Sequence, residues 1–354
     1  MKTVARIYRW IIISLIIQVI ILIYFNNIYL KRSVAGNLKV TEYDTVKKVS
    51  STSVNIPENA KNIQVSSDSA YVMYSVGNSI EFIEVEKNKK VKTINSPEGT
   101  ELTFFEWISG KNIAIYTFSM ENLSSPELKV YTYDVENDVE RYFGGNSDNV
   151  DDTITSVPAG SIVVDICMSA PTNTAYVKVK TGENRAKLYK YETQGVLSTV
   201  GYYDIGIDFE MAYLEDTLLY RSEFAKLAVR TGRTGEVKVL SFDNDFIIIG
   251  VDNDDNIYLA ELNNEGKVTG VIYGRHDEEP KQSWKRLTLS TPTEKDDVLL
   301  TSNGNVYVLE KNQKILYNMK SQNNKQFTGK FLQATENYII TQESGKLFFD
   351  PINK

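Results

Sequence analysis

The chain of 354 residues has one cysteine, Cys167, and one histidine, His276. A single cysteine excludes a disulfide framework within the chain and any metal site built on several cysteines. A Ser–His–Asp triad would have to use His276, and the sequence has no G-x-S-x-G elbow to present the nucleophile. We therefore expect Cys167 to be a buried strand residue and His276 a solvated loop residue.

Other functional motifs are also missing. The sequence contains no phosphate-binding loop, no dinucleotide fingerprint and no stretch of interleaved basic and aromatic residues. The first 32 residues hold five of the 39 basic residues and no acidic residue, so the remainder has 34 basic and 46 acidic residues and a net charge of −12. Such a surface repels nucleic acid. The sequence therefore predicts neither a nucleic-acid nor a nucleotide partner.

The N-terminus contains one long apolar run, "WIIISLIIQVIILIYF", which only Ser14 and Gln18 interrupt. Counted on to Leu30 it is about 21 residues long, enough for a membrane-spanning helix. Basic residues precede it, which favours a cytoplasmic N-terminus. We predict a cytoplasmic tail at 1–9, a transmembrane helix at 10–30 and a short linker at 31–37. The membrane-embedded residues would be Trp10, Ile11, Ile12, Ile13, Leu15, Ile16, Ile17, Val19, Ile20, Ile21, Leu22, Ile23, Tyr24 and Phe25.

Two alternatives to a retained anchor stay open. The sequence "SVA" ending at Ala35 resembles a signal-peptidase site, although it lies about ten residues beyond the apolar core. A domain that stays in the cytoplasm is the other alternative. No cysteine follows the run closely, so it is not a lipoprotein signal. The favoured interpretation is a single-pass protein of the cytoplasmic membrane with its C-terminal domain outside the cell. The Asn-, Lys-, Ile- and Tyr-rich composition is common in bacteria with AT-rich genomes.

Beyond residue 60 the sequence repeats a β pattern. A polar turn precedes short apolar strands in seven units, which begin at Ser69, Asn112, Thr174, Thr217, Asn256, Asn305 and Asn337. A repeat of about 40–45 residues with four strands is typical of a β-propeller blade. We predict an all-β fold, a seven-bladed β-propeller (six to eight blades) over residues 38–354, preceded by the transmembrane helix.

Each predicted blade begins with a nearly continuous apolar run, as expected for a strand buried on both faces. The inner-strand candidates are "NIQVS", "LTFFEW", "SIVVDI", "EMAYL", "FIIIGV", "DVLLT" and "KFLQA". The seventh unit ends before a fourth strand. The alternating stretch 38–54 can supply that strand and close the ring. We expect Thr45–Ser53 to pair with the strand around Lys346–Phe349.

Short motifs resemble those of extracytoplasmic propellers. "DNDDNIYLAE" and "SNGNVYVLE" are similar to the turn and strand of membrane-anchored sensor propellers, and "SSDSAYVMYS" is similar to a turn of the TolB-like family. The resemblance implies a propeller outside the cytoplasm. The tryptophan–aspartate pair of the common intracellular repeats is missing.

Acidic residues recur in the predicted connections between blades. We predict that they converge into a negative funnel that attracts a cation, a basic partner surface or an amino sugar. Acidic loops in an acidic protein are the alternative. "YYDIGIDFE" contributes Asp208 and Glu210 to this pattern as well as an aromatic pair. The candidate binding residues are Asp151, Asp152, Asp204, Asp245, Asp296 and Asp297, with Tyr202 and Tyr203 beside them.

A calcium loop is a weaker prediction. Asp252, Asp254 and Asn256 occupy alternate positions, as at the start of such a loop. The helix–loop–helix type fails, because Ile257 and Asn263 stand where it needs Gly and Glu. Asp and Asn also favour tight turns. We expect turn chemistry and no cofactor, with calcium as the alternative.

Together these features favour a non-enzymatic binding or scaffold subunit of a bacterial cell-envelope complex. The predicted partners are the membrane and other envelope proteins or a surface polysaccharide. An enzyme is the first alternative, because propeller lyases and hydrolases can act with paired carboxylates. A ligand sensor that works with a membrane partner is the second. The sequence does not identify the ligand.

Overall fold

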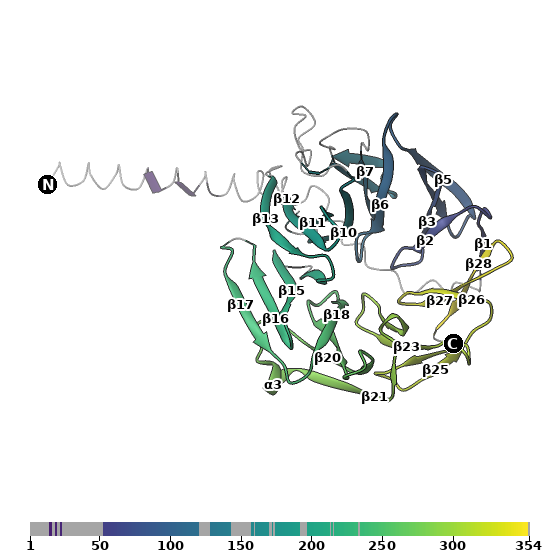
Figure 1. The fold of residues 1–354 in the computed structure, drawn as a ribbon. Coiled ribbons are helices and arrows are strands. Elements are labelled where there is room, and N and C mark those ends of the chain that lie inside the picture. Colours follow the sequence, from purple (N-terminus) through teal and green to yellow (C-terminus); the bar gives the residue numbers. More distant parts are fainter. Residues whose placement is uncertain are drawn as a thin grey trace. The chain divides into compact units, whose positions relative to one another are not determined.

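The computed structural model describes residues 14–15, 18–19, 22, 52–119, 128–142, 157–158, 160–169, 172, 174–191, 197–212, 214, 216–232 and 234–352. The unit that spans residues 50–354 is a closed ring of seven four-stranded antiparallel sheets (Figure 1). This confirms the predicted seven-bladed β-propeller.

The blades follow one another along the chain, and we number them in that order. Blade 1 contains β2 (Lys61–Val65), β3 (Tyr71–Val76), β4 (Ser79–Glu84) and β5 (Lys89–Asn95), and blade 2 contains β6 (Glu101–Trp107), β7 (Ile113–Ser119), β8 (Leu128–Asp134) and β9 (Val139–Tyr142). Blade 3 contains β10 (Ile162–Ser169), β11 (Thr174–Lys180), β12 (Arg185–Tyr191) and β13 (Leu197–Asp204), and blade 4 contains β14 (Phe209–Ala212), β15 (Thr217–Glu223), β16 (Lys226–Thr231) and β17 (Val237–Ser241).

Blade 5 contains β18 (Phe246–Val251), β19 (Ile257–Leu262), β20 (Val268–Gly274) and β21 (Lys285–Thr293), with the short helix α3 (Pro280–Ser283) before its last strand. Blade 6 follows the 3-10 turn η2 (Lys295–Asp297) and contains β22 (Val298–Leu300), β23 (Val306–Glu310), β24 (Ile315–Asn318) and β25 (Asn324–Gln326). The seven inner strands β2, β6, β10, β14, β18, β22 and β26 (Lys330–Ala334) coincide with the seven predicted runs.

Blade 7 takes its outer strand from the N-terminal side of the chain. Its sheet order is β1 (Thr52–Asn55), β28 (Lys346–Pro351), β27 (Tyr338–Glu343) and β26. Thr52 pairs with Phe349 and Asn55 pairs with Lys346. The predicted partner strand is therefore found, but its pairing extends to Asn55, and residues 45–51 of the predicted strand lie outside the described residues.

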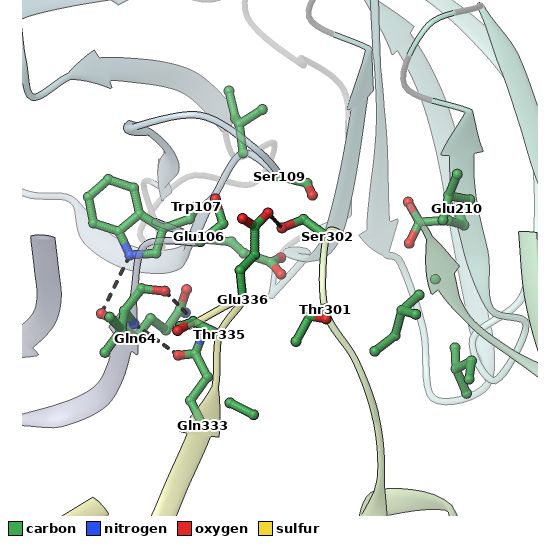
Figure 2. A pocket seen from close by; sticks show the side chains of 18 residues that line it. Gln64, Glu106, Trp107, Ser109, Glu210, Thr301, Ser302, Gln333, Thr335 and Glu336 are labelled. Carbon is green, nitrogen blue, oxygen red and sulfur yellow. Dashed lines mark hydrogen bonds between the residues drawn. The ribbon is translucent and has the colours of Figure 1, made fainter. Parts of the chain in front are cut away.

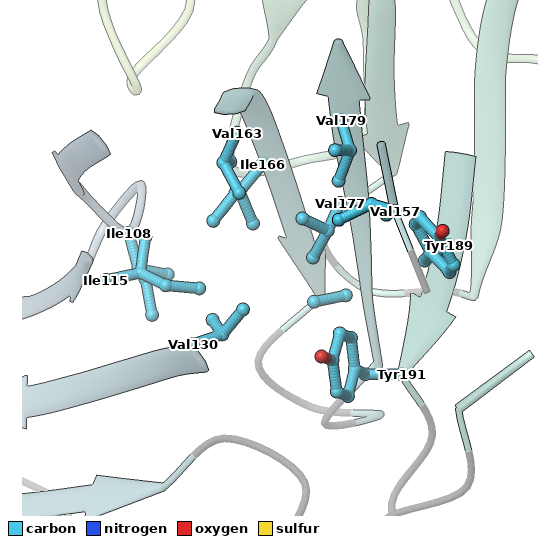
Figure 3. Close-up of a cluster of buried hydrophobic side chains, with 11 residues drawn as sticks. Ile108, Ile115, Val130, Val157, Val163, Ile166, Val177, Val179, Tyr189 and Tyr191 are labelled. Atoms are coloured by element: carbon cyan, nitrogen blue, oxygen red, sulfur yellow. The ribbon is translucent and has the colours of Figure 1, made fainter. Parts of the chain in front are cut away.

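The hydrophobic core is divided among the interfaces between blades. Seven clusters of buried side chains lie in the described residues, one between each pair of neighbouring blades. Between blades 2 and 3, Ile115 and Val130 face Ile166, Val177 and Tyr191 (Figure 3). Both faces of each sheet are thus covered, which explains why the inner strands read as continuous apolar runs.

The alternating strand directions give the ring two different ends. At one end, which we call the turn face, the inner strands finish and turn into the second strands. At the other end, which we call the link face, each outer strand passes to the next inner strand. This follows because successive strands of every sheet are antiparallel.

The N-terminal unit, residues 1–49, is described at only five positions. Ser14, Leu15, Gln18, Val19 and Leu22 are helical, and the Gln18 side chain donates a hydrogen bond to Ser14. Among the described residues, no helix meets the length and hydropathy that a bilayer crossing requires. The other residues of the predicted transmembrane helix lie outside the described part, so this helix stays a prediction.

Candidate functional site

The central channel holds a cavity of about 420 Å³ at its turn-face end. Its wall consists of the last residues of the inner strands and the turns that follow, contributed by blades 1, 2, 4, 5, 6 and 7. A second cavity of about 110 Å³ adjoins it and adds blade 3 through Asp165 and Cys167. Both cavities are lined by Glu106, Trp107 and Glu210, which Figure 2 shows in the larger one.

One side of this channel is acidic. Glu106 on β6, Asp165 on β10 and Glu210 on β14 come from three consecutive blades. The remaining walls present uncharged residues such as Gln64, Thr301 and Gln333, together with Glu336, which accepts a hydrogen bond of 2.6 Å from Ser302 Oγ (Figure 2).

The three carboxyls are easier to protonate than free ones. Burial raises the pKa of Glu106 to about 7, and the charge of Asp165 adds to this. Burial also raises the pKa of Glu210 to about 8, although the Met211 amide donates a hydrogen bond to its Oε1. The Glu106 side chain is exposed, and it lines both cavities of the channel. Enclosure by walls of low polarisability disfavours the charged form.

Asp165 differs from its two neighbours because a cation faces it. Burial raises its pKa to about 6, and Lys178, its pairing partner on β11, limits the rise. Lys178 is itself buried, its Nζ donates to the Ile207 carbonyl at 2.7 Å, and burial lowers its pKa. The charge of Asp208 also raises the pKa of Asp165, and burial raises the pKa of Asp208 itself.

The inner strands of blades 7, 1 and 2 are joined by side-chain amides. Gln333 Oε1 accepts a hydrogen bond from the Val65 amide at 2.9 Å, and Gln333 Nε2 donates to the Val65 carbonyl at 3.0 Å. Gln64 Nε2 donates to the Phe105 carbonyl at 3.0 Å. Trp107 Nε1 donates to the Gln64 carbonyl at 3.4 Å. Each glutamine thus links its own blade to the next one.

Among the described residues of the predicted funnel, none lines either cavity. Asp204, Asp245, Asp296 and Asp297 lie on the link face, at the connections between blades. Asp151 and Asp152 are outside the described residues.

Two of these link-face acids have basic partners. Asp245 Oδ2 lies 3.1 Å from Arg221 Nη1, and Asp297 Oδ1 lies 2.5 Å from Lys311 Nζ. These ion pairs reduce the negative field that the link face presents. A partner site there stays a prediction.

The two predicted aromatic residues have different environments. Tyr202 is 62% exposed on the outer strand of blade 3, and the charged groups of Lys187 and Arg185 lie 5.6 and 6.0 Å from its ring centroid. Tyr203 packs between blades 3 and 4, against Phe209 and Tyr220.

The suggested calcium residues form a tight turn. Both carboxylate oxygens of the buried Asp252 accept hydrogen bonds, from the Asp254 and Asn256 amides, the Asn256 side chain and the Tyr258 hydroxyl. Within the described ranges, no three His, Cys, Asp or Glu side chains are grouped as metal ligands would be. Turn chemistry accounts for the Asp252 carboxylate.

Sequence reasoning missed Glu106 and Asp165 and assigned Glu210 to the wrong set. A usable signal was present, because "LTFFEW", "SIVVDI" and "EMAYL" each place a carboxyl within an inner-strand run. A charged residue in a strand covered on both faces is uncommon unless it faces a hollow or a partner.

Comparison with protein families and with curated proteins finds no match. Among solved structures, the chain is similar to Hsv2 of Kluyveromyces lactis, with 12% identity, a TM-score of 0.48, and coverage of 82% of this chain and 89% of that one. It is also similar to the WD40 domain of SCAP from fission yeast, with 8% identity, a TM-score of 0.43, and coverage of 84% and 85%. A third similar structure is dipeptidyl peptidase 4 of Porphyromonas gingivalis, with 12% identity, a TM-score of 0.43, and coverage of 75% and 44%. The class of protein, a seven-bladed propeller, follows from the strand order itself.

Proposed function

We propose that this chain is a non-enzymatic binding subunit of a cell-envelope complex, held at the membrane by its N-terminal apolar run and resembling TolB-like and sensor propellers. Its channel cavity accommodates a cationic group. That group is a lysine or arginine side chain of a partner protein or the amine of an amino sugar in a surface polymer.

One observation carries this proposal, the arrangement of charge in the cavity. Glu106 and Glu210 occupy one side of the main cavity, Asp165 lines the smaller cavity that adjoins it, and the other walls are largely uncharged. A cation that enters meets carboxyls in a medium of low polarisability, where opposite charges attract strongly. The indole of Trp107 lies in the same wall, and its ring face suits a cation or a sugar.

The cavity size is compatible with such a ligand. Binding sites for small molecules occupy about 300–1,000 Å³, and the main cavity measures about 420 Å³. This volume holds one side chain or one sugar ring rather than a folded element. A macromolecular partner would therefore insert a single group and rest its remaining surface on the turn face.

The test uses the full-length protein in detergent and charged probes with neutral counterparts. We expect glucosamine and an oligolysine peptide to change the tryptophan fluorescence, and N-acetylglucosamine to have little effect. The variant Glu106→Gln/Asp165→Asn/Glu210→Gln should lose the response. Equal binding of the neutral sugar, or full binding by the triple variant, would refute a cation site in the channel.

A second function has one observation in its favour. Burial places the pKa of Asp165 at about 6 and that of Glu210 at about 8, so at neutral pH one acid is largely ionised and the other largely protonated. A polysaccharide lyase or hydrolase needs such a pair. New reducing ends or unsaturated products from envelope polysaccharides, absent with Glu210→Gln, would support this alternative.

A further inference from the structure

The two glutamines that link neighbouring inner strands occupy equivalent positions in their blades, and every blade has a residue at this position. The pairing registers of the first two strands in each blade identify it as Gln64, Glu106, Cys167, Glu210, Gly250, Leu299 and Gln333. In each blade the turn into the second strand begins two residues after this position. The neighbouring residues Val65, Trp107 and Met211 pack toward the preceding blade, so this position faces the following blade.

Glutamine at this position bridges to the next blade by donating a hydrogen bond, and in blade 7 it also accepts one. Gln333 accepts from the Val65 amide and donates to the Val65 carbonyl, and Gln64 donates to the Phe105 carbonyl. In blades 2 and 4 the same position holds Glu106 and Glu210. A neutral carboxyl has the shape of the amide and can both donate and accept, whereas a carboxylate can only accept.

We propose that Glu106 and Glu210 are proton-operated bridges between inner strands. When neutral, each carboxyl donates to the next blade as the two glutamines do, while Glu210 Oε1 keeps the hydrogen bond that it accepts from the Met211 amide of its own strand. When ionised, it loses the donor, faces the carbonyl groups of the next inner strand, and leaves its negative charge in the cavity. The channel therefore alternates between a bridged, neutral wall and an unbridged, anionic wall, whatever the ligand.

The surroundings favour this exchange near neutral pH. Burial is the largest cause that raises the pKa of both glutamates. The charge of Asp165 on β10 raises both pKa values further, and the charge of Glu106 also raises the pKa of Glu210. Within the described part of the chain, the other ionisable groups around these carboxyls are Lys178 and Asp208, which act through Asp165, Cys167 beside Glu210, and Glu336 across the cavity. The residues that β18, β22 and the turns after them contribute to the cavity wall are uncharged.

The sign of the effect on stability follows from proton binding. The ordinary pKa of both glutamates is 4.5, below the values of about 7 and about 8 in the folded chain. Between these limits the folded protein binds more protons than the unfolded one, so the free energy of unfolding falls as the pH rises. The stabilisation from these two groups is fully present at a pH below the unfolded-state pKa. It is lost as the pH rises through the pKa values of the folded protein.

The experiment compares thermal unfolding of the full-length protein from about pH 5 to about pH 8.5, a window that spans both pKa values. We expect the Tm of the wild type to fall with rising pH more steeply than that of Glu106→Gln/Glu210→Gln, whose amides bridge at every pH. The wild type should also show a protonated-carboxyl infrared band near neutral pH that the double variant lacks.

A matched control moves the ionisable group to another blade. The variant is Gln333→Glu, with Gln64→Glu as the second choice. Its Tm should fall with rising pH more steeply than that of the wild type, because the new carboxyl can ionise and the glutamine cannot. Parallel Tm curves for the wild type and the double variant, or an unchanged infrared band, would overturn the proposal. Because no ligand is present, this outcome is independent of the cation-binding test.

Discussion

The strand that closes the ring is open to a direct test through Val54 and Ile56. Val54 lies on β1 and is fully buried, and Ile56, just beyond it, is 5% exposed. Both belong to the cluster between blades 7 and 1, with Val72, Ile340 and Leu347. The double substitution Val54→Ala/Ile56→Ala keeps the backbone pairing of β1 but removes its apolar anchors.

The size of the effect follows from what is removed. Val54→Ala deletes two buried methyl-sized groups, at about 0.8 kcal/mol each for the lost burial. Ile56→Ala costs about 2–5 kcal/mol once the residual cavity is included. We therefore expect the free energy of unfolding to fall by about 4–7 kcal/mol, a large part of the roughly 5–15 kcal/mol of a typical domain.

The assay is urea unfolding of the full-length protein, followed by tryptophan fluorescence. The matched control is Val237→Ala/Val239→Ala, on the outer strand β17 of blade 4, where these side chains are 45% and 49% exposed. The control should change the free energy of unfolding by less than about 1 kcal/mol, since each exposed substitution stays within about 0.5 kcal/mol. If both double variants unfold at the same urea concentration, β1 does not contribute to ring closure as argued.

Three further outcomes are expected. The full-length protein should fractionate with the membrane and begin at Met1, whereas a mature N-terminus at Gly36 would show that "SVA" is cleaved. Asp252→Ala should lower the free energy of unfolding by about 1–3 kcal/mol, because the Tyr258 hydroxyl and Asn256 lose their buried acceptor. EDTA should leave the Tm of the wild type unchanged, and a large EDTA effect would restore the calcium hypothesis. Asp297→Asn should lower the Tm rather than raise it, because Asp297 is buried beside Lys311; a higher Tm would instead indicate repulsion among the link-face acids.

The fold could be predicted from the sequence because its signals are local and repeated. Each inner strand is covered on both faces, so its apolar run is visible without knowledge of its neighbours, as in "FIIIGV" and "KFLQA". The closing strand was predicted from the incomplete seventh unit, and the observed strand Thr52–Asn55 overlaps the end of the predicted segment and continues beyond it. Alternation over residues 38–54 does not distinguish Thr45–Ser53 from Thr52–Asn55, and the pairing depends on packing of Val54.

The candidate site could not be predicted in the same way, because it depends on where strands from different blades end. Asp245 and Asp297 were chosen for their place in connections, but nothing in the sequence indicates the partners Arg221 and Lys311. Glu106 and Asp165 were overlooked because a carboxyl within an apolar run resembles an interruption of the strand. Only the closed ring brings their side chains into one hollow.

The equivalence of Glu106 and Glu210 with Gln64 and Gln333 connects stability with binding. A glutamine at all four positions would keep the side-chain hydrogen bonds between neighbouring inner strands at every pH. The cavity would then lack most of its negative charge. At high pH the two glutamates ionise. They then no longer donate to the next blade, and their negative charge lies where a cation would enter. A cation that binds the ionised pair must also displace protons below about pH 8, so its affinity should rise with pH as the stability of the empty ring falls.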